Sequence, residues 1–518
     1  MVASALPVLG FFDFWRMRVS RACKMRGFDS WLTLGFTLAL TLPCLVYRYL
    51  PMVDLPQHEA IVSIMLNLRE RMFGFDAYYA WAPERTLYLV PYGLAAGLAQ
   101  TMPLHRAINV VAFLATIAYP IGIVSYLRAM KRPAYLGLIA LPVVYNQSFF
   151  WGFINFNLSV GLAFFTISLL IGVWSKPKAV FVALLSCLVA LTHVYGLAVL
   201  GSYWCLWLLT GERCEARRRV PALAPAALLL TTWFALVVRA RGFTEFDWNG
   251  ISGRWSRLLE SVVGGWRGHS EQMGLLLSAL AILAFFRHSV PLSFKRWRQL
   301  SVHQRVVWVF IATNLLFYFL MPELPLAATK SSFRHAQLAI MAVPLTLGSD
   351  PPDGISSWAR LCLCGIGLWT MFFSWTHFSR FDAEARSFDA ILDAIPPRSR
   401  IAQLTYDRRG KVASVPAYMH FAAYAQAQHG GLLAVSFPAR FWNMPIALNA
   451  NFDPPEIPQD LEWNPQFFGM AHLDRYFDTV VLRAGLNQTF RLPKPFPYQL
   501  QLNSGPWWLF RKVESVHD

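Results

Sequence analysis

The stretch PMVDLPQHEAIVSIM, residues 51–65, directly follows an almost uninterrupted apolar run, Trp31–Leu50, that is long enough to cross a bilayer. Asp54, His58 and Glu59 therefore lie within about one and a half helical turns of one another, next to the predicted end of a membrane span. Ionisable groups near the hydrocarbon are costly and usually have a function. The stretch thus combines a membrane anchor with three residues suited to acid–base chemistry.

The composition indicates a polytopic α-helical membrane protein. Of the 518 residues, 56% are hydrophobic and only 14% are charged, and many apolar runs approach the length that crosses a hydrocarbon core of ~30 Å. The net charge of +17 would suggest a nucleic-acid partner in a soluble protein. Here much of the Lys and Arg lies in short loops between apolar runs, as in cytoplasmic loops. We therefore expect no nucleic acid among its partners.

The spacing of the apolar runs predicts about eleven transmembrane helices. The first is Trp31–Leu50, and the others lie near 106–127, 134–149, 152–174, 179–193, 195–210, 220–238, 271–287, 306–321, 335–348 and 358–378. This threading places the basic loops and the basic N-terminal residues 1–30 in the cytoplasm. It leaves the loops 51–105 and 239–270 on the outer side, provided that the segment 86–102 is interfacial or re-entrant.

The last 140 or so residues differ from the rest, because their apolar runs shorten to strand length. RIAQLTYD (400–407), FDTVVLRA (477–484) and PWWLFRKV (506–513) predict strands, and the segments between them include helix-like sequences. We therefore expect a small α/β domain over 379–518, on the outer face of a membrane module that spans 31–378.

Asp54 has two interpretations. Apolar residues recur at helical spacing after Pro56, which predicts a helix lying on the membrane surface. Asp54 precedes that helix, and Gln57 follows three residues later, which is the pattern of a capping box. Asp54 could thus do no more than accept a hydrogen bond from the first turn. The alternative is a catalytic carboxylate.

A resemblance favours the catalytic interpretation. An Asp just past the first transmembrane helix, in an outer loop that continues as a helix, resembles the catalytic loop of GT-C fold glycosyltransferases, among them protein O-mannosyltransferases and the bacterial enzymes that decorate lipid A with aminoarabinose. DLPQHEA (54–60) is similar to a loop of many bacterial membrane proteins of this superfamily. FFWGFINFNLSVGLAF (149–164) and HFAAYAQAQHGG (420–431) also look like stretches of those proteins.

The resemblance implies a reaction: transfer of a sugar from a polyprenyl phosphate to a cell-envelope acceptor, with inversion at the anomeric carbon. Phosphate leaves readily, so one carboxylate acting as general base on the acceptor hydroxyl can suffice. Asp54 is the predicted base, with Glu59 as an alternative or partner and His58 either to orient the base or to bind the acceptor. The loop lacks the Asp-x-Asp pair that oligosaccharyltransferases use to hold a divalent metal, and no cysteine spacing indicates a zinc site. Whether the reaction requires a divalent metal stays open.

The donor phosphate requires cations on the outer side. Arg334 and His335 are the first candidates, and their alternative role is to anchor a helix end at the interface. Further candidates are Lys330, Arg254 and Arg257. The last two belong to a basic ledge with Trp248, Trp255 and Trp266, which suits anionic membrane lipids.

Three other polar residues fall on the same predicted side. His193 and Asn155 are candidates for binding sugar hydroxyls, although hydrogen-bonded helix packing explains them equally well. Glu323 is more typical of a solvated loop acid.

The predicted location is the bacterial inner membrane, with the C-terminal domain in the periplasm. Two other functions stay open at this level: a transporter or flippase for a lipid-linked saccharide, and a non-catalytic subunit of an envelope-polysaccharide assembly complex.

Overall fold

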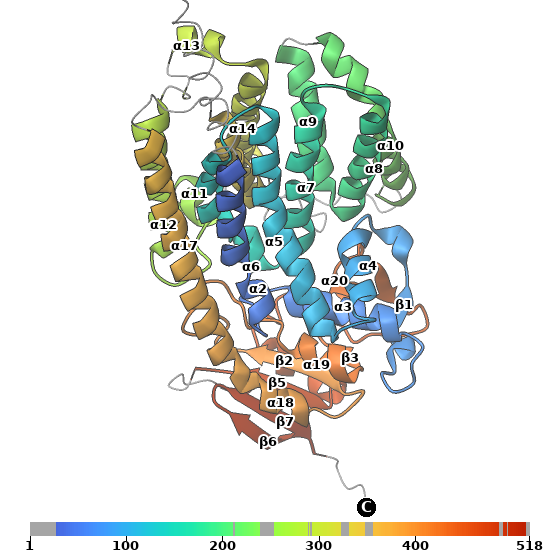
Figure 1. Ribbon diagram of the computed structural model, residues 1–518. Coiled ribbons are helices and arrows are strands. Elements are labelled where there is room, and N and C mark those ends of the chain that lie inside the picture. Colours follow the sequence, from blue (N-terminus) through green and yellow to red (C-terminus); the bar gives the residue numbers. More distant parts are fainter. Residues whose placement is uncertain are drawn as a thin grey trace, which may run out of the picture.

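The computed structural model describes residues 27–210, 213–238, 253–287, 290, 293–322, 331–347, 356–485, 491–494 and 496–513. Figure 1 shows a tall bundle of helices with a small β-sheet at its lower end. Helix α17 (Ser356–Ala385) runs along the bundle and down to the sheet, so it connects the two parts.

The bundle is built from the apolar runs of the sequence. Its helices are Gly27–Val46, which ends in α2 (Pro43–Val46), α5 (Leu104–Ala129), α7 (Ile154–Leu170), α8 (Lys176–Thr192), α9 (Val194–Thr210), α10 (Arg213–Trp233), α12 (Ser270–Phe286), α14 (Val302–Leu320), α15 (Ser331–Met341) and α17. Short helices connect the larger elements: η1 (Phe75–Ala77), η2 (Pro83–Arg85), η4 (Phe234–Val238), α11 (Arg254–Val262), α13 (Phe294–Gln299), α16 (Val343–Thr346), η7 (Arg386–Phe388), α18 (Asp389–Ala394), α20 (Phe437–Arg440), α21 (Phe467–Met470) and η8 (Leu473–Arg475).

Four helical stretches in the described part of the chain are long and apolar enough to cross a membrane: Gly27–Val46, Leu104–Ala129, Arg213–Val237 and Ser356–Ala394. Several shorter apolar helices stand beside them. Helix α7, for example, has 17 residues and extends about 26 Å at 1.5 Å per residue. The chain is thus a polytopic helical membrane protein, and the number of eleven spans stays a prediction.

One of the predicted spans differs in detail, whereas the segment 86–102 is as short as expected for a segment that does not span. The segment near 134–149 is a 3₁₀-helix, η3 (Ala134–Val143), followed by α6 (Gln147–Trp151), and all ten residues of η3 are buried. Pro142 lacks the N–H that a regular helix requires there. In 86–102 the helix is α4 (Leu89–Leu98), whose ten residues cover only about 15 Å, too short for a single span.

Five strands of the C-terminal region form one mixed sheet. Strands β2 (Arg400–Thr405), β3 (Leu432–Leu433), β5 (Thr479–Arg483), β6 (Tyr498–Ser504) and β7 (Trp507–Lys512) lie in the order β3-β2-β5-β7-β6. Strand β2 is parallel to β3 and β5, whereas β7 is antiparallel to β5 and β6. The three strands predicted from the sequence are confirmed as β2, β5 and β7.

The loop 51–105 packs against this C-terminal region and pairs one strand with it. Strand β1 (Tyr79–Trp81) pairs with β4 (Ile446–Leu448), and helix α3 (Leu55–Asn67) packs against α19 (Ala422–His429). Every residue from Leu55 to Ile64 is buried. The prediction of a surface helix is therefore wrong, because the C-terminal region covers the face of α3 that was expected to meet water.

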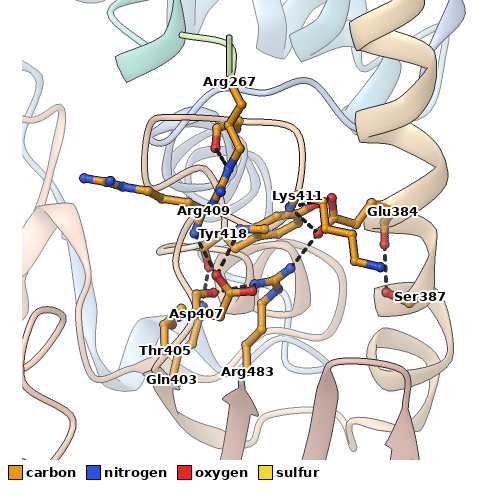
Figure 2. Close-up of polar contacts among 12 residues, drawn as sticks. Arg267, Glu384, Ser387, Gln403, Thr405, Asp407, Arg409, Lys411, Tyr418 and Arg483 are labelled. Carbon is orange, nitrogen blue, oxygen red and sulfur yellow. Dashed lines mark hydrogen bonds and ion pairs between the residues drawn. The ribbon is translucent and has the colours of Figure 1, made fainter. Parts of the chain in front are cut away.

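An ion cluster fixes α17 to the sheet. Figure 2 shows the guanidinium of Arg483, at the end of β5, directed toward Asp407 and Glu384. Its nitrogens lie 2.6 Å from an Asp407 oxygen and 3.0 Å from a Glu384 oxygen, and its centre lies 3.7 Å from the ring centre of Tyr418. Burial disfavours the charge of Asp407, but Arg483 and backbone N–H donors outweigh that effect and lower the pKa of Asp407.

The predicted basic, Trp-rich ledge is only partly formed. Trp266 is buried against Phe150, with ring centres 5.0 Å apart, and pairs its backbone with Ala413 of the C-terminal region. The assignment of Trp266 to a lipid-facing ledge is therefore wrong. Trp255 is exposed, and Trp248 lies outside the described residues.

Candidate functional site

The side chain of Asp54 does not cap α3. The backbone of Asp54 is in the helical region (φ −95°, ψ −4°), and its carboxylate makes no capping hydrogen bond. A capping side chain needs an extended backbone to turn back onto the helix. Gln57 is also occupied elsewhere, since it bonds to the backbone of Val435 and Phe437. The capping-box interpretation is therefore wrong, and the Asp54 carboxylate is available for another contact.

That contact is His420, which precedes α19. An Asp54 oxygen lies 3.3 Å from His420 Nδ1, and His420 Nε2 lies 3.1 Å from a Glu462 oxygen. Arg440 donates to the other Glu462 oxygen at 2.7 Å. The four side chains form a line of alternating charge, which we call the Asp54–Arg440 chain. Its far half comes entirely from the C-terminal region.

The charges of this chain stabilise one another. Burial alone would disfavour the imidazolium of His420, but Asp54 and Glu462 outweigh burial and raise the pKa of His420 to about 9. Burial opposes the charge of Glu462 as well, yet His420 and Arg440 lower its pKa. His420 is therefore protonated at neutral pH, and its ion pair with Asp54 fixes the orientation of the carboxylate.

His58 lies on α3, the helix that begins directly after Asp54, and its surroundings disfavour the charged form that His420 adopts. Its Nδ1 lies 2.8 Å from the Tyr92 hydroxyl, and its Nε2 lies 3.1 Å from the carbonyl oxygen of Gly152. Burial lowers the pKa of His58, although Asp54 and the Gly152 carbonyl oppose that effect. A neutral imidazole can donate to Gly152 and accept from Tyr92, so His58 connects three segments around the cleft.

Gly152 allows the chain to approach Asp54 closely. It has a φ of +87°, and a Cβ atom there would lie 2.8 Å from the backbone nitrogen of Asp54. That nitrogen donates to the Trp151 carbonyl oxygen at 3.2 Å. Any side chain at position 152 would push the turn away from the carboxylate.

A narrow cleft of about 70 Å³ opens between Asp54 and the helix bundle. Five of the residues selected from the sequence, Asp54, His58, Asn155, His193 and Arg334, line it. The rest of the lining is Tyr88, Tyr92, Phe153, Phe156, Phe437, Phe441, Asn443 and Met444. The ring of His193 stacks on Tyr88 at 4.5 Å. We call this space the bundle cleft.

Arg334 is the cation of the bundle cleft. It is 5% exposed, and its guanidinium carbon lies 4.5, 5.5 and 5.2 Å from the ring centres of Phe153, Phe156 and Tyr195. Its Nε has no hydrogen-bond partner, and no carboxylate among the described residues forms an ion pair with it. Aromatic faces stabilise a cation without neutralising it. Arg334 is therefore a buried positive charge without a counter-ion in the described part of the chain, at a place where an anion can bind.

A wider cavity of about 690 Å³ opens on the other side of Asp54. It shares Asp54, Phe153, Phe437 and Phe441 with the bundle cleft. The rest of its lining comes from the C-terminal region, apart from Trp151, and includes His420, Arg440 and Glu462. We call this space the outer cavity. Asp54 thus lies where the two spaces meet.

Several candidates from the sequence lie away from both spaces. Arg254 donates to the carbonyl oxygens of Tyr318 and Met321, whereas Arg257 is exposed. The Nδ1 of His335 lies 3.0 Å from an Asn314 oxygen. None of the three lines the cleft or the cavity. Lys330 and Glu323 lie outside the described residues.

Glu59 is also apart from the two spaces, although it follows His58 directly. It is buried, and burial raises its pKa to about 8, with Arg48 opposing. Glu59 is an electrostatic neighbour of Tyr49 and Tyr424, so it faces the contact between the first loop and α19. The geometry therefore gives Glu59 no direct access to a substrate beside Asp54.

Sequence reasoning missed the residues of the Asp54–Arg440 chain that follow Asp54. His420 begins the stretch HFAAYAQAQHGG, which the resemblance had selected without a role. Glu462 lies in a Pro-rich loop, and Arg440 ends the short aromatic helix α20; neither sequence contains a motif. No local signal in either segment indicates contact with Asp54.

The apolar bundle, the sheet region at one end of it and the carboxylate just past the first apolar helix belong to a polytopic membrane protein with the GT-C fold. A solved structure with the same fold is that of ArnT from Cupriavidus metallidurans bound to undecaprenyl phosphate, with a TM-score of 0.54 over 93% of this chain and 98% of that chain. The two sequences are 10% identical. The resemblance inferred from the sequence is thus confirmed at the level of the fold. Comparisons with protein-family models and with curated protein sequences give no match.

Proposed function

We propose that this protein is a membrane glycosyltransferase that moves a sugar from a polyprenyl-phosphate donor to a cell-envelope acceptor. The observation that carries the proposal is the position of Asp54 between a cleft with an unneutralised buried cation and a separate, wider cavity. A transferase for an anionic donor needs two substrate sites that meet at a base. The fold shared with an undecaprenyl phosphate-bound ArnT supports this class of donor.

In the proposed reaction Asp54 is the general base. The acceptor hydroxyl gives its proton to the Asp54 carboxylate while its oxygen bonds to the anomeric carbon of the donor. The bond from that carbon to the phosphate oxygen breaks, and polyprenyl phosphate leaves with the electron pair, so the anomeric centre inverts. A base of this kind contributes about 10²–10⁴ in rate.

The other residues have supporting roles in this proposal. Arg334 balances the negative charge of the phosphate, as buried donors do for developing anions. His193 and Asn155 are placed to bind the sugar, and His58 holds the Gly152 turn against Asp54. A cleft of about 70 Å³ has room for little more than a few water molecules. We therefore expect the Phe437–Phe441 segment to move when the donor binds.

The proposed orientation places the sheet region, residues 379–518, in the periplasm of a bacterial inner membrane, with 31–378 as the membrane module. Helix α13, which carries Lys295, Arg296 and Arg298, lies at the end of the bundle away from the sheet (Figure 1). Basic segments favour the cytoplasmic side, and this supports the orientation. Single cysteines at Glu70 and Ala450 should react with an impermeant thiol reagent from the periplasm. Cysteines at Met130 and Glu215 should not, and labelling at Met130 would overturn the topology.

The function is tested by mass analysis of envelope glycolipids and polyprenyl-linked sugars, with and without the gene. Loss of the gene should remove one glycan modification and cause a lipid-linked sugar to accumulate on the periplasmic leaflet. An Asp54→Asn protein should be inserted in the membrane at normal levels and give the same pattern. If Asp54→Asn restores the glycan in full, the base assignment is wrong. Accumulation of the donor on the cytoplasmic leaflet instead would indicate a flippase.

A further inference from the structure

The outer cavity differs from the bundle cleft in how its charges are arranged. Its lining contains three carboxylates, Asp54, Asp460 and Glu462, and two cationic side chains, His420 and Arg440. Both cations are already engaged. His420 lies between Asp54 and Glu462, and Arg440 pairs with Glu462 and donates to the Gln459 carbonyl oxygen at 2.8 Å.

This arrangement disfavours an anionic ligand. A phosphate or a carboxylate in the outer cavity would meet more negative than positive charge, and each cation that it approached would have to leave a carboxylate partner. Breaking a buried ion pair leaves a charge uncompensated, and that is strongly unfavourable. The contrast with Arg334 is direct, because the charge of Arg334 has no partner among the described residues.

The rest of the lining offers flat apolar surfaces with polar edges. Aromatic rings come from Trp151, Phe153, Phe437, Phe441 and Trp463, and the adjacent Pro454 and Pro455 add rigid apolar surface. Gln459 and the carboxylates supply hydrogen-bonding groups. Sugar rings present C–H faces for aromatic stacking and hydroxyls at their edges, so this mixture matches them better than a purely apolar ligand.

The volume of the outer cavity also suits a ligand made of several sugar units. About 690 Å³ lies within the range of roughly 300–1,000 Å³ that is typical of ligand sites. It is about ten times the volume of the bundle cleft, so it can take several sugar units without rearrangement.

We propose that the outer cavity binds the acceptor as a neutral saccharide chain, and that a hydroxyl of its terminal sugar reaches Asp54. This inference rests on the proposed function for its role, but binding itself can be measured without transfer. It assigns the acceptor a chemical class: uncharged, hydroxyl-rich sugars stacked on Trp463 and the Phe437–Phe441 segment, and not phosphorylated or acidic glycans.

The test is calorimetric titration of the full-length protein in detergent with matched pairs of trisaccharides. One pair is neutral galactotriose and trigalacturonic acid, which differ only by oxidation at C6, and the second pair is built from glucose and glucuronic acid. Neutral mannotriose and a Ser/Thr-rich peptide complete the set. At least one neutral trisaccharide should bind saturably, and its acidic counterpart should bind about tenfold more weakly or not at all.

Two variants sharpen the result. Glu462→Gln removes the carboxylate that holds Arg440, so the preference for the neutral trisaccharide over its acidic partner should shrink. Trp463→Ala should weaken neutral binding roughly tenfold or more, as the loss of a central aromatic contact does. Trp358→Ala is the matched control, because Trp358 is an exposed tryptophan on α17 away from the cavity.

The outcomes separate this inference from the proposed function. Asp54→Asn should keep saccharide binding while it blocks transfer, so a failure of Asp54 as base leaves the binding result intact. Equal or tighter binding of the acidic trisaccharides to the wild-type protein overturns the inference. Binding of the peptide alone, or of no neutral trisaccharide, does so as well.

Discussion

Two buried arginines, Arg483 and Arg334, differ in their ion-pair partners. Arg483 is 1% exposed and is paired with Glu384 and Asp407 beside the rings of Tyr418 and Trp507. Arg334 is 5% exposed and lies among three aromatic rings without a carboxylate in ion-pair distance in the described part of the chain. Both arginines are buried and both lie beside aromatic rings, so neither burial nor aromatic contact distinguishes them.

The counter-ion distinguishes them. A buried cation that is already neutralised has no charge left for a ligand, and its removal leaves carboxylates unpaired. A buried cation without a counter-ion destabilises the empty protein and can regain that free energy when an anion binds. Arg483 is therefore expected to matter for stability, and Arg334 for activity.

The largest effect is expected from Arg483→Met. The substitution leaves Glu384 and Asp407 without their cation, and should lower the free energy of unfolding by about 3–5 kcal/mol. Thermal unfolding of the detergent-solubilised protein, followed by circular dichroism, measures this. The triple variant with Glu384→Gln and Asp407→Asn should recover part of the loss. A single variant that unfolds like the wild type would show that the cluster does not anchor α17.

Arg334→Met should produce the reverse pattern. Transfer should fall by about 10²–10³, as for the loss of one donor to a developing anion, whereas the melting temperature should stay the same or rise because a desolvated charge is removed. The assay is transfer from a polyprenyl-phosphate sugar, with thermal unfolding of the same preparation. Arg334→Lys keeps the charge but loses the planar group, and should retain part of the activity. If Arg334→Met is fully active, the donor phosphate binds elsewhere.

Two buried groups, Glu59 of the first loop and His420 of the C-terminal region, predict a pH dependence of stability. The folded-state pKa of Glu59 is about 8, above its ordinary value of 4.5, and that of His420 is about 9, above 6.5. Between each pair of values the folded protein binds the extra proton, so stability falls as pH rises through that window. The contribution of Glu59 to stability is lost between about pH 4.5 and pH 8, and that of His420 between about pH 6.5 and pH 9.

Glu59→Gln separates the two contributions. The variant should melt at about the same temperature as the wild type at pH 4.5 and at a higher temperature at pH 8, where each kcal/mol is worth about 2–4 °C. The remaining decline toward pH 9 should persist, because His420 is unchanged. A melting temperature that falls at pH 8 would mean that the ionised form of Glu59 has a stabilising partner. Activity should be largely retained, since Glu59 lines neither the cleft nor the cavity.

The smallest effect is expected from Arg257→Ala. Arg257 is exposed, so stability should change by less than about 0.5 kcal/mol, and transfer should be unaffected. Assays of both, beside Arg334→Met, test whether cations of the 253–262 segment share in donor binding. A transfer defect as large as that of Arg334→Met would restore the basic ledge as a donor site.

Much of the architecture followed from local patterns. Apolar runs long enough for the bilayer predicted the helices of the bundle, and apolar runs of strand length predicted β2, β5 and β7. Asp54, His58, Asn155, His193 and Arg334, selected from separate parts of the sequence, line one cleft. These predictions succeeded because hydrophobic length and periodicity depend on neighbouring residues alone.

The errors came from contacts between distant segments. The sequence pattern of α3 indicated an exposed face, but α19 covers it. Asp54 had the sequence of a helix cap, but its backbone angles and the approach of His420 gave it another partner. Trp266 was expected at the interface, and it pairs with Ala413 instead. No local rule predicts which segment will cover a given surface.

The sequence by itself therefore determined that this is a helical membrane protein with strands in its C-terminal region and a carboxylate just past its first apolar helix. Those features follow from the free energy of moving each segment between water and hydrocarbon, which is a property of the segment. Only the tertiary structure decided which charges are neutralised. Asp54 pairs with an imidazolium, Arg483 pairs with two carboxylates, and Arg334 pairs with none among the described residues. An ion pair depends on distances of a few ångströms between residues far apart in the chain.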